Sequence, residues 1–386
     1  MSLPRLPPPS LPPLLARLQS WSAINSGSDH LAGLARMTDG LEAALRELTP
    51  DVARVPLDDS GRVALRARMR PAAHHRILCS GHYDTVFGAD HPFQKPTLHE
   101  DTGRLNGPGV ADMKGGLVVM MAALAAFEQT PEANQIGWTV LLTPDEETGS
   151  IVSAPEIEAA AASHHLGLVF EPARETGALV KSRSATAVFR AEVHGRAAHA
   201  GRNPEDGRNA ITALAQFCLD VEAFPESIPD TLVNVGNIQG GAATNIVPDH
   251  AVAEVNARAS TSTGVEALES AFQAAAKSLN AREGYTMSLT GGFHRHPLQV
   301  TPLRESLFAN LSQCSTDLGH GALEWEHVSG GSDGNLLHAA GLPVLDGMGP
   351  IGGGLHSDRE YIQTASLASR AQIPAPLLNR LASGAT

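Results

Sequence analysis

The sequence has few cysteines, no long apolar run and fewer basic than acidic residues, and each shortage argues against a class of protein. Its three cysteines, Cys79, Cys218 and Cys314, stand far apart and form no CxxC pair. A disulfide framework is therefore not expected, and a reducing compartment is favoured. The longest apolar run, from Gly115 to Phe127, is too short to span a bilayer.

The shortage of basic residues bears on partners. With 28 Lys and Arg against 41 Asp and Glu, the formal net charge is −13. This charge argues against nucleic acid or an anionic membrane as a partner. An anionic small substrate stays possible, because a local arginine or a metal ion can override the global field. The Pro-rich start, MSLPRLPPPSLPPLLARL, lacks the unbroken apolar core of a signal peptide, so a cytoplasmic location is expected.

The pattern of apolar residues predicts an α/β fold. At 386 residues the chain is long enough for two domains. After two amphipathic helices, strand and helix patterns alternate, which favours a largely parallel sheet covered by helices. The alternating segments are strands at 77–80, 138–143 and 166–170, and helices at 114–127 and 154–163. The pattern resumes near the end with a helix at 303–318, a strand at 343–345 and a helix near 363–381.

The middle of the chain has a different character. Here the predicted order is β-α-β-β-α-β, the order of a ferredoxin-like unit. Its segments are strands at 185–193, 233–238, 251–257 and 285–289 and helices at 206–221 and 264–279. Because α/β segments flank it on both sides, we expect an inserted domain at 184–293 between two parts of a catalytic domain, 1–183 and 294–386.

Histidines and acidic residues lie where the predicted strands end or Gly-rich loops begin. His82 and Asp84 lie two apart, so in a strand both would face one site. Ligands of parallel sheets bind at the carboxyl edge, where residues distant in sequence converge. Two imidazoles and three carboxylates would meet there: His82, Asp112, Glu147, Glu171 and His356. Such a set suits two Zn²⁺ ions that share one bridging carboxylate and activate one water.

These motifs resemble the M20 family of metallopeptidases, nearest to its glutamate carboxypeptidase branch and related to acetylornithine deacetylase and succinyl-diaminopimelate desuccinylase. The resembling stretches, over residues 75–362, are GHYDTV, NGPGVADMKGG, TPDEETGS, FEP, GRAAHAG, TNIVP, NAR and LHSD. The resemblance implies a zinc-peptidase catalytic domain of mostly parallel sheet, an inserted α+β dimerisation domain, and a homodimer with small-molecule substrates.

The resemblance also implies a role for each matching residue. His82 and Glu171 would bind one zinc ion, Glu147 and His356 the other, and Asp112 both. Glu146 matches the general base, and Asp84 the carboxylate that orients His82. From the inserted domain, His199 would reach the partner subunit's active site. Asn245 and Arg258 match substrate-binding positions, and Gly330 lies in a loop that faces substrate. The same ligands accept Co²⁺ or Mn²⁺.

The expected reaction is hydrolysis of an amide bond in a small N-acyl amino acid or dipeptide-like substrate with a free carboxylate. A carboxypeptidase that releases a C-terminal amino acid such as glutamate is favoured, and a deacylase of the same family is the alternative. Two further alternatives stay open. Gly330-Gly331-Ser332-Asp333-Gly334 fits the G-x-S-x-G elbow of serine hydrolases, and Asp346 and His356 follow as acid and base in the Ser-Asp-His order. The other alternative is a protein that binds metal without catalysis. The presence of Glu146 and Asp84 gives no reason to expect that activity has been lost.

Overall fold

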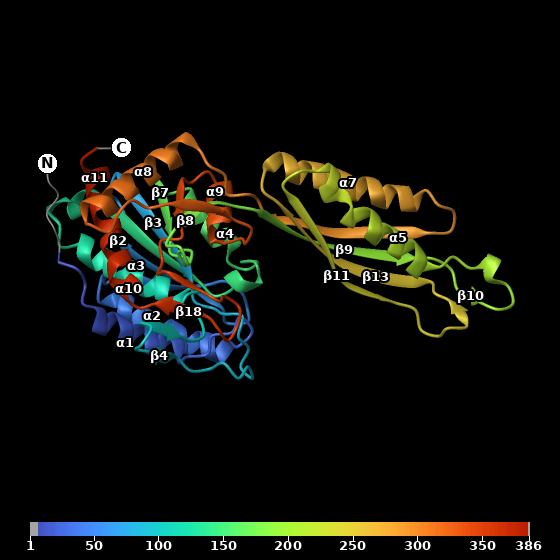
Figure 1. Cartoon of the computed structure of the whole chain (residues 1–386), viewed down its shortest axis with the longest axis horizontal. Coiled ribbons are helices and arrows are strands. Elements are labelled where there is room, and N and C mark those ends of the chain that lie inside the picture. The colour runs from blue at the N-terminus through green and yellow to red at the C-terminus, as the bar shows by residue number, and fades with distance from the viewer. Residues whose placement is uncertain (1–6, 385–386) are drawn as a thin grey trace. The chain divides into compact units, whose positions relative to one another are not determined.

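The computed structural model describes residues 7–384, which divide into two units (Figure 1). Unit 1 comprises residues 7–181, 300–327 and 332–384, and unit 2 comprises 182–299 and 328–331. The expected inserted domain was 184–293. Unit 2 also takes in the residues up to 299 because Arg183 and Leu298 form an antiparallel bridge.

Unit 1 is built on one eight-stranded sheet, in the order β1-β2-β6-β3-β7-β16-β8-β15. The strands are β1 (Val52–Pro56), β2 (Val63–Met69), β3 (His75–His82), β6 (Ile136–Thr143), β7 (Leu166–Val169), β8 (Leu179–Arg183), β15 (Trp325–Val328) and β16 (Val344–Asp346). Strands β6, β3, β7 and β16 are parallel neighbours. The expected mixed α/β class with a mostly parallel central sheet is confirmed.

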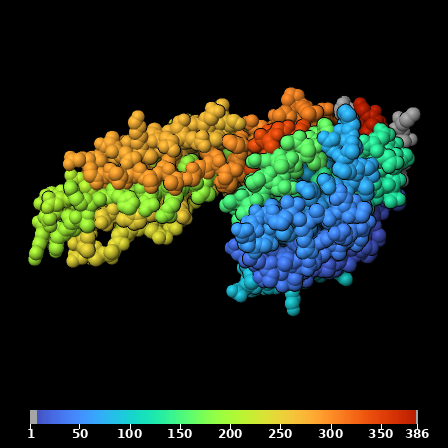
Figure 2. Space-filling model, turned by 180° about the vertical axis from the view of Figure 1, so that it is seen from behind, coloured from blue at the N-terminus to red at the C-terminus, as the bar shows by residue number. Residues whose placement is uncertain are grey.

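Helices cover this sheet on both faces, since β6 and β7 are buried along their whole length. The helices are α1 (Leu11–Ser22), α2 (Leu31–Arg46), α3 (Lys114–Phe127), α4 (Ala154–Ala161), α8 (Pro302–Asp317), α9 (Asp333–Ala339), α10 (Ala365–Gln372) and α11 (Pro374–Ala382), with 3-10 turns η1 (Pro131–Gln135) and η2 (Glu146–Thr148). Helix α3 is apolar almost all round because it packs between β3 and the helices α1, α10 and α11. Seen from behind, the N-terminal residues, coloured blue, form most of one face of unit 1 (Figure 2).

Close packing at the start of α3 explains one glycine of the NGPGVADMKGG stretch. A Cβ atom on Gly116 would lie 1.8 Å from the carbonyl oxygen of Phe170. The helix therefore approaches the end of β7 without a side chain in between, and this approach brings the Asp112 and Glu171 segments together.

A small antiparallel sheet lies in unit 1 as well, in the order β17-β18-β5-β4. Its strands are β4 (Thr97–His99), β5 (Arg104–Asn106), β17 (Gly352–Gly353) and β18 (Tyr361–Gln363). The loop between β17 and β18 carries His356, so this sheet holds a late segment of the chain against residues 104–106.

Unit 2 has the predicted β-α-β-β-α-β order. It consists of β9 (Ala185–His194), α5 (Ala210–Glu222), β11 (Thr231–Gly240), β13 (His250–Ala259), α7 (Ser262–Asn280) and β14 (Thr286–Arg295), with the short elements β10 (Ala198–His199), η3 (Pro204–Asp206), α6 (Phe224–Ser227) and β12 (Ile246–Val247). The sheet is antiparallel in the order β11-β13-β9-β14, and α5 and α7 lie along one face (Figure 1). Alternate residues of β9 and β13 are buried under these helices, which leaves the other face open to solvent.

Two expected helices differ from the structure. The C-terminal helix is divided into α10 and α11, which meet at Ile373. Pro374 lacks a backbone N–H and disfavours helical geometry at the residue before it, so one helix ends and another begins there. Helix α5 starts at Ala210, later than expected, because the Asn209 side chain caps it by accepting a hydrogen bond from the Thr212 amide.

No helix among residues 7–384 is long and apolar enough to cross a membrane.

Candidate active site

The candidate site lies at the carboxyl edge of the parallel strands of unit 1. In the register of these strands, His82 is level with Thr143 and Ser80 with Val169. His82 therefore ends β3 beside the turn that carries Glu146 and Glu147, and Glu171 follows β7 on the other side. This edge brings together residues that are far apart in the sequence.

One group of donor atoms surrounds the His82 side chain. Its Nε2 atom lies 3.1 Å from Oδ1 of Asp112 and 3.6 Å from Oε1 of Glu171. The three side chains are nearly or wholly buried. A second group surrounds His356, whose Nε2 lies 3.3 Å from Oδ2 of Asp112 and 3.1 Å from Oε2 of Glu147. The two carboxylate oxygens of Asp112 thus face two different histidines.

This donor set fits metal ions. Zinc with bonds of about 2.0–2.2 Å in tetrahedral geometry holds neighbouring donor atoms roughly 3.4 Å apart. The four separations given above lie close to that spacing. Donor atoms of His82, Asp112 and Glu147, and those of His82, Glu146 and Glu171, each lie within 4.8 Å of one another. Imidazole nitrogen with carboxylate oxygen is the combination that zinc, cobalt and manganese accept.

The charges of the site are balanced between imidazole and carboxylate. Hydrogen bonds to Asp112 and Glu147 raise the pKa of His356 to about 11. Burial opposes protonation of His82, but its hydrogen bonds to Asp112 and Asp84 outweigh burial and raise its pKa well above the usual value. Burial, with the Asp112 charge beside it, raises the pKa of Glu147 to about 8. The carboxylates thus favour positive charge between them, which a bound cation would supply in place of the two protons.

Asp84 holds the pieces of the site together. Its carboxylate is 3.1 Å from Nδ1 of His82, accepts hydrogen bonds from the amides of Glu146 and Glu147, and accepts one from the Ser28 hydroxyl. It is completely buried. One side chain therefore orients the imidazole of His82, fixes the turn of η2 and ties both to the loop before α2.

Glu360 is a supporting residue that the sequence analysis missed. Its buried carboxylate accepts hydrogen bonds from the amides of Gly109, Ala111 and Asp112. Burial and the nearby Asp112 charge raise its pKa to about 7. Glu360 thus fixes the backbone of the loop that presents Asp112. Its partners are backbone amides, which leave no side-chain motif, and its closeness to the LHSD stretch was the one available signal.

Two further buried acids shape the turn after β6. The Asp145 carboxylate accepts hydrogen bonds from the amide of Val152 and from the amide and hydroxyl of Ser153. Asp333 accepts hydrogen bonds from the hydroxyls of Thr143 and Ser150, on either side of this turn. Both acids therefore stabilise the turn that contains η2.

Ser332, the candidate nucleophile of the serine-hydrolase alternative, has a structural role. It is fully buried, donates to Oδ2 of Asp346 at 2.9 Å and accepts from the Gly334 amide as the N-cap of α9. A nucleophilic serine needs exposure to substrate and a base within hydrogen-bond reach. His356, the base in that alternative, is engaged with Asp112 and Glu147 instead.

The remaining predicted site residues belong to unit 2. His199 is exposed on β10, opposite Ile246 of β12, and Asn245 is exposed in the loop before β12. Arg258 is half-buried on β13 and donates a 2.6 Å hydrogen bond to the carbonyl of Ser329. Gly330 follows Ser329, and its own carbonyl accepts a hydrogen bond from Arg183. Arg258 and Arg183 thus hold the segment 328–331 within unit 2.

This donor set, at this edge of an α/β sheet, defines a hydrolase. Comparison with known protein families agrees. The model of Peptidase family M20/M25/M40 matches residues 78–380, so the chain belongs to this family. It is an enzyme that hydrolyses amide bonds.

Two relatives of known name are a carboxypeptidase and a desuccinylase. Carboxypeptidase G2 of Pseudomonas sp. (strain RS-16) is 25% identical over 379 residues, covering 97% of this chain and 90% of that protein. Succinyl-diaminopimelate desuccinylase of Verminephrobacter eiseniae is 30% identical over 305 residues, covering 74% of this chain and 73% of that protein. Among solved structures, a tripeptidase from Staphylococcus aureus has the same fold, with a TM-score of 0.77 at 22% identity over 97% of this chain and 99% of that one.

Proposed function

We propose that this protein is a dinuclear zinc hydrolase that releases a C-terminal amino acid, such as glutamate, from a small N-acyl or dipeptide-like substrate. The observation that carries the proposal is the position of Asp112, whose two carboxylate oxygens face His82 and His356 separately. One carboxylate placed between two histidines, each with a further carboxylate of its own, supports two neighbouring metal positions.

In this proposal His82 and Glu171 would hold one zinc ion, Glu147 and His356 would hold the second, and Asp112 would serve both. When bound, the two ions act as Lewis acids on the amide carbonyl and lower the pKa of the attacking water. Glu146 accepts the proton of that water and later donates a proton to the leaving amine. Its neighbour Glu147 would be a poor base, because its lone pairs would be engaged with metal. Asp84 positions the imidazole of His82 and increases its basicity.

Unit 2 supplies the substrate-binding residues in this proposal. A guanidinium matches a carboxylate in geometry, so Arg258, with Asn245 and the Gly330 segment, would hold the free carboxylate of the substrate. His199 of the partner subunit would stabilise the oxyanion, which requires a homodimer with unit 2 as the dimerisation domain. The cytoplasmic location stays a prediction from composition.

The test is hydrolysis of a panel of N-acyl glutamates, N-succinyl amino acids, dipeptides and tripeptides, before chelation, after chelation and after Zn²⁺ is restored. We expect cleavage that chelation abolishes and zinc restores, with two zinc ions per chain at this site. Cleavage that is indifferent to chelation would overturn the metal proposal. Recovery with one metal ion per chain at this site would overturn its dinuclear part.

The second candidate function is removal of an acyl group from an amine, as the name of the desuccinylase relative suggests. The metal ligands and the base would be the same, so the panel distinguishes the two candidates by substrate, because one hydrolysis of an N-acyl glutamate releases the acyl acid and glutamate together. A higher kcat/KM for N-succinyl derivatives of amino acids other than glutamate than for peptides that end in glutamate would favour the deacylase.

A further inference from the structure

The open face of the unit 2 sheet carries a second cluster of imidazoles and carboxylate. His194 is the last residue of β9 and lies directly opposite His250, the first residue of β13. Glu192 lies two residues before His194, so its side chain points to the same face of the sheet. The helices α5 and α7 cover the opposite face, and all three side chains are open to solvent in part.

The donor atoms of the cluster converge. Oε1 of Glu192 lies 2.8 Å from Nε2 of His250 and 3.5 Å from Nε2 of His194. The two imidazole rings are 4.8 Å apart between centroids and tilted by 32°. All three donor atoms lie within 4.8 Å of one another. Zinc needs donor atoms roughly 3.4 Å apart, so small side-chain rotations would bring these three into its coordination shell.

We propose that Glu192, His194 and His250 form a second metal site, distinct from the candidate active site, which binds a transition-metal ion of the Zn²⁺ class. Two imidazoles select zinc, copper or nickel and disfavour the hard cations Mg²⁺ and Ca²⁺. Three protein ligands leave a fourth position open. The antiparallel register of β9 and β13 holds both histidines side by side, so the ion requires no change of backbone.

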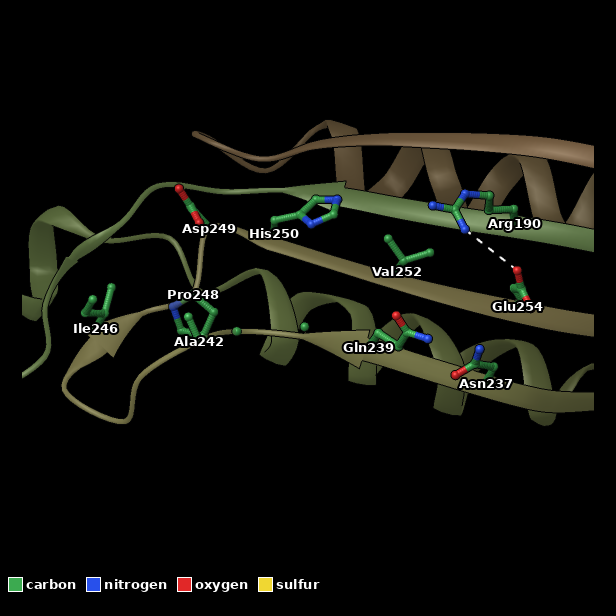
Figure 3. Close-up of a pocket in the computed structure, with 12 residues that line it drawn as sticks. Arg190, Asn237, Gln239, Ala242, Ile246, Pro248, Asp249, His250, Val252 and Glu254 are labelled. Atoms are coloured by element: carbon green, nitrogen blue, oxygen red, sulfur yellow. Dashed lines mark ion pairs between the residues drawn. The ribbon is translucent and has the colours of Figure 1, made fainter.

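A cavity lies beside the proposed metal site. His250 also lines a cavity of about 420 Å³ in unit 2, together with Arg190, Asn237, Gln239 and Glu254 (Figure 3). Arg190 is the cationic side chain of this wall and pairs with Glu254 at 3.7 Å and, more weakly, with Glu192 at 3.9 Å. The Arg190 guanidinium lies beside Glu192 and would lower the affinity of the empty site for a cation.

The test is equilibrium dialysis of the full chain against Zn²⁺ over a range of free concentrations, with bound zinc counted per chain. We expect His194→Asn and His250→Asn to bind one zinc ion fewer than the wild type and to retain its hydrolytic activity. His294→Asn, which removes a histidine from β14 of the same sheet, is the matched control and should bind as many ions as the wild type.

Two results would overturn this site. The first is an equal number of bound zinc ions in the wild type and in the His194→Asn/His250→Asn double variant. The second is a loss of bound zinc in His294→Asn as large as the loss in the double variant. The electron paramagnetic resonance spectrum of added Cu²⁺ gives a second readout, because hyperfine structure from two imidazole nitrogens should vanish in either single variant. The comparison is a difference between variants, so it holds whether the candidate active site binds two ions, one or none.

Discussion

The two clusters of imidazole and carboxylate in this chain are built by different means. The cluster of unit 1 joins the ends of parallel strands, is buried except for His356, and rests on a layer of other acids that includes Asp84 and Glu360. The cluster of unit 2 depends on the register of two antiparallel strands, and its histidine side chains are about half exposed. A change in unit 1 should therefore spread to its neighbours, whereas a change in unit 2 should stay local.

The largest effect is expected for Glu146→Gln. The amide keeps the size of the side chain but cannot accept a proton, and general-base catalysis contributes about 10²–10⁴-fold. We expect kcat to fall by that factor with no change in bound metal. Steady-state kinetics and metal analysis of the same sample measure both quantities, and near-full turnover would remove Glu146 from the role of base.

His199→Ala tests whether unit 2 contributes to the chemistry. Loss of one oxyanion donor costs about 10²–10³-fold in kcat. The metal content should not change, because His199 lies in the other unit from the proposed ligands. Mixing this variant with Glu146→Gln should restore part of the activity if His199 acts on the partner subunit. Zinc lost from His199→Ala would contradict the assigned position.

Asp84→Asn tests the buried supporting layer. The amide keeps an acceptor for the turn of η2 but loses the charge that orients His82, and such supporting partners contribute about 10–100-fold in metal affinity. Zinc competition with a chromophoric chelator measures this loss. Asp39→Asn, a substitution at a surface acid paired with Arg54, serves as the control and should leave metal affinity unchanged. Equal affinity in both variants would show that Asp84 does not support the site.

The smallest effect on turnover is expected for Ser332→Ala. Loss of an N-cap hydroxyl costs about 0.5–2 kcal/mol of stability. We expect the urea midpoint to fall while kcat/KM stays within about threefold of the wild type, since the hydroxyl is buried beneath α9. A collapse of turnover in a folded Ser332→Ala protein would restore the serine-hydrolase alternative.

Most of the fold was predictable because buried strands and amphipathic helices leave clear apolar patterns. Helix α3 has the predicted bounds, Lys114 to Phe127, and the order of unit 2 follows the prediction. Strands β1 and β2 were not predicted, although the arginines at alternate positions 66 and 68 of β2 are typical of a strand with one polar face. The division of the C-terminal helix at Pro374 was also readable from the sequence.

The metal-ligand candidates were predictable as a set because they are histidines and acids placed at strand ends. Their supporting residues were not, since Glu360 and Asp145 act through backbone amides that any residue can provide. The contribution of residues 328–331 to unit 2 was hidden for the same reason: the carbonyls of Ser329 and Gly330 accept the hydrogen bonds from Arg258 and Arg183.

The hydrogen bond from Ser28 to Asp84 shows that residues upstream of the family match contribute to the candidate active site. The family signature begins at residue 78, yet a hydroxyl well upstream of it touches the carboxylate that orients His82. The loop between α1 and α2 thus contributes to the support of the candidate active site. A truncated protein that starts at residue 78 would keep every expected metal ligand but would lack the Ser28 hydroxyl that contacts Asp84.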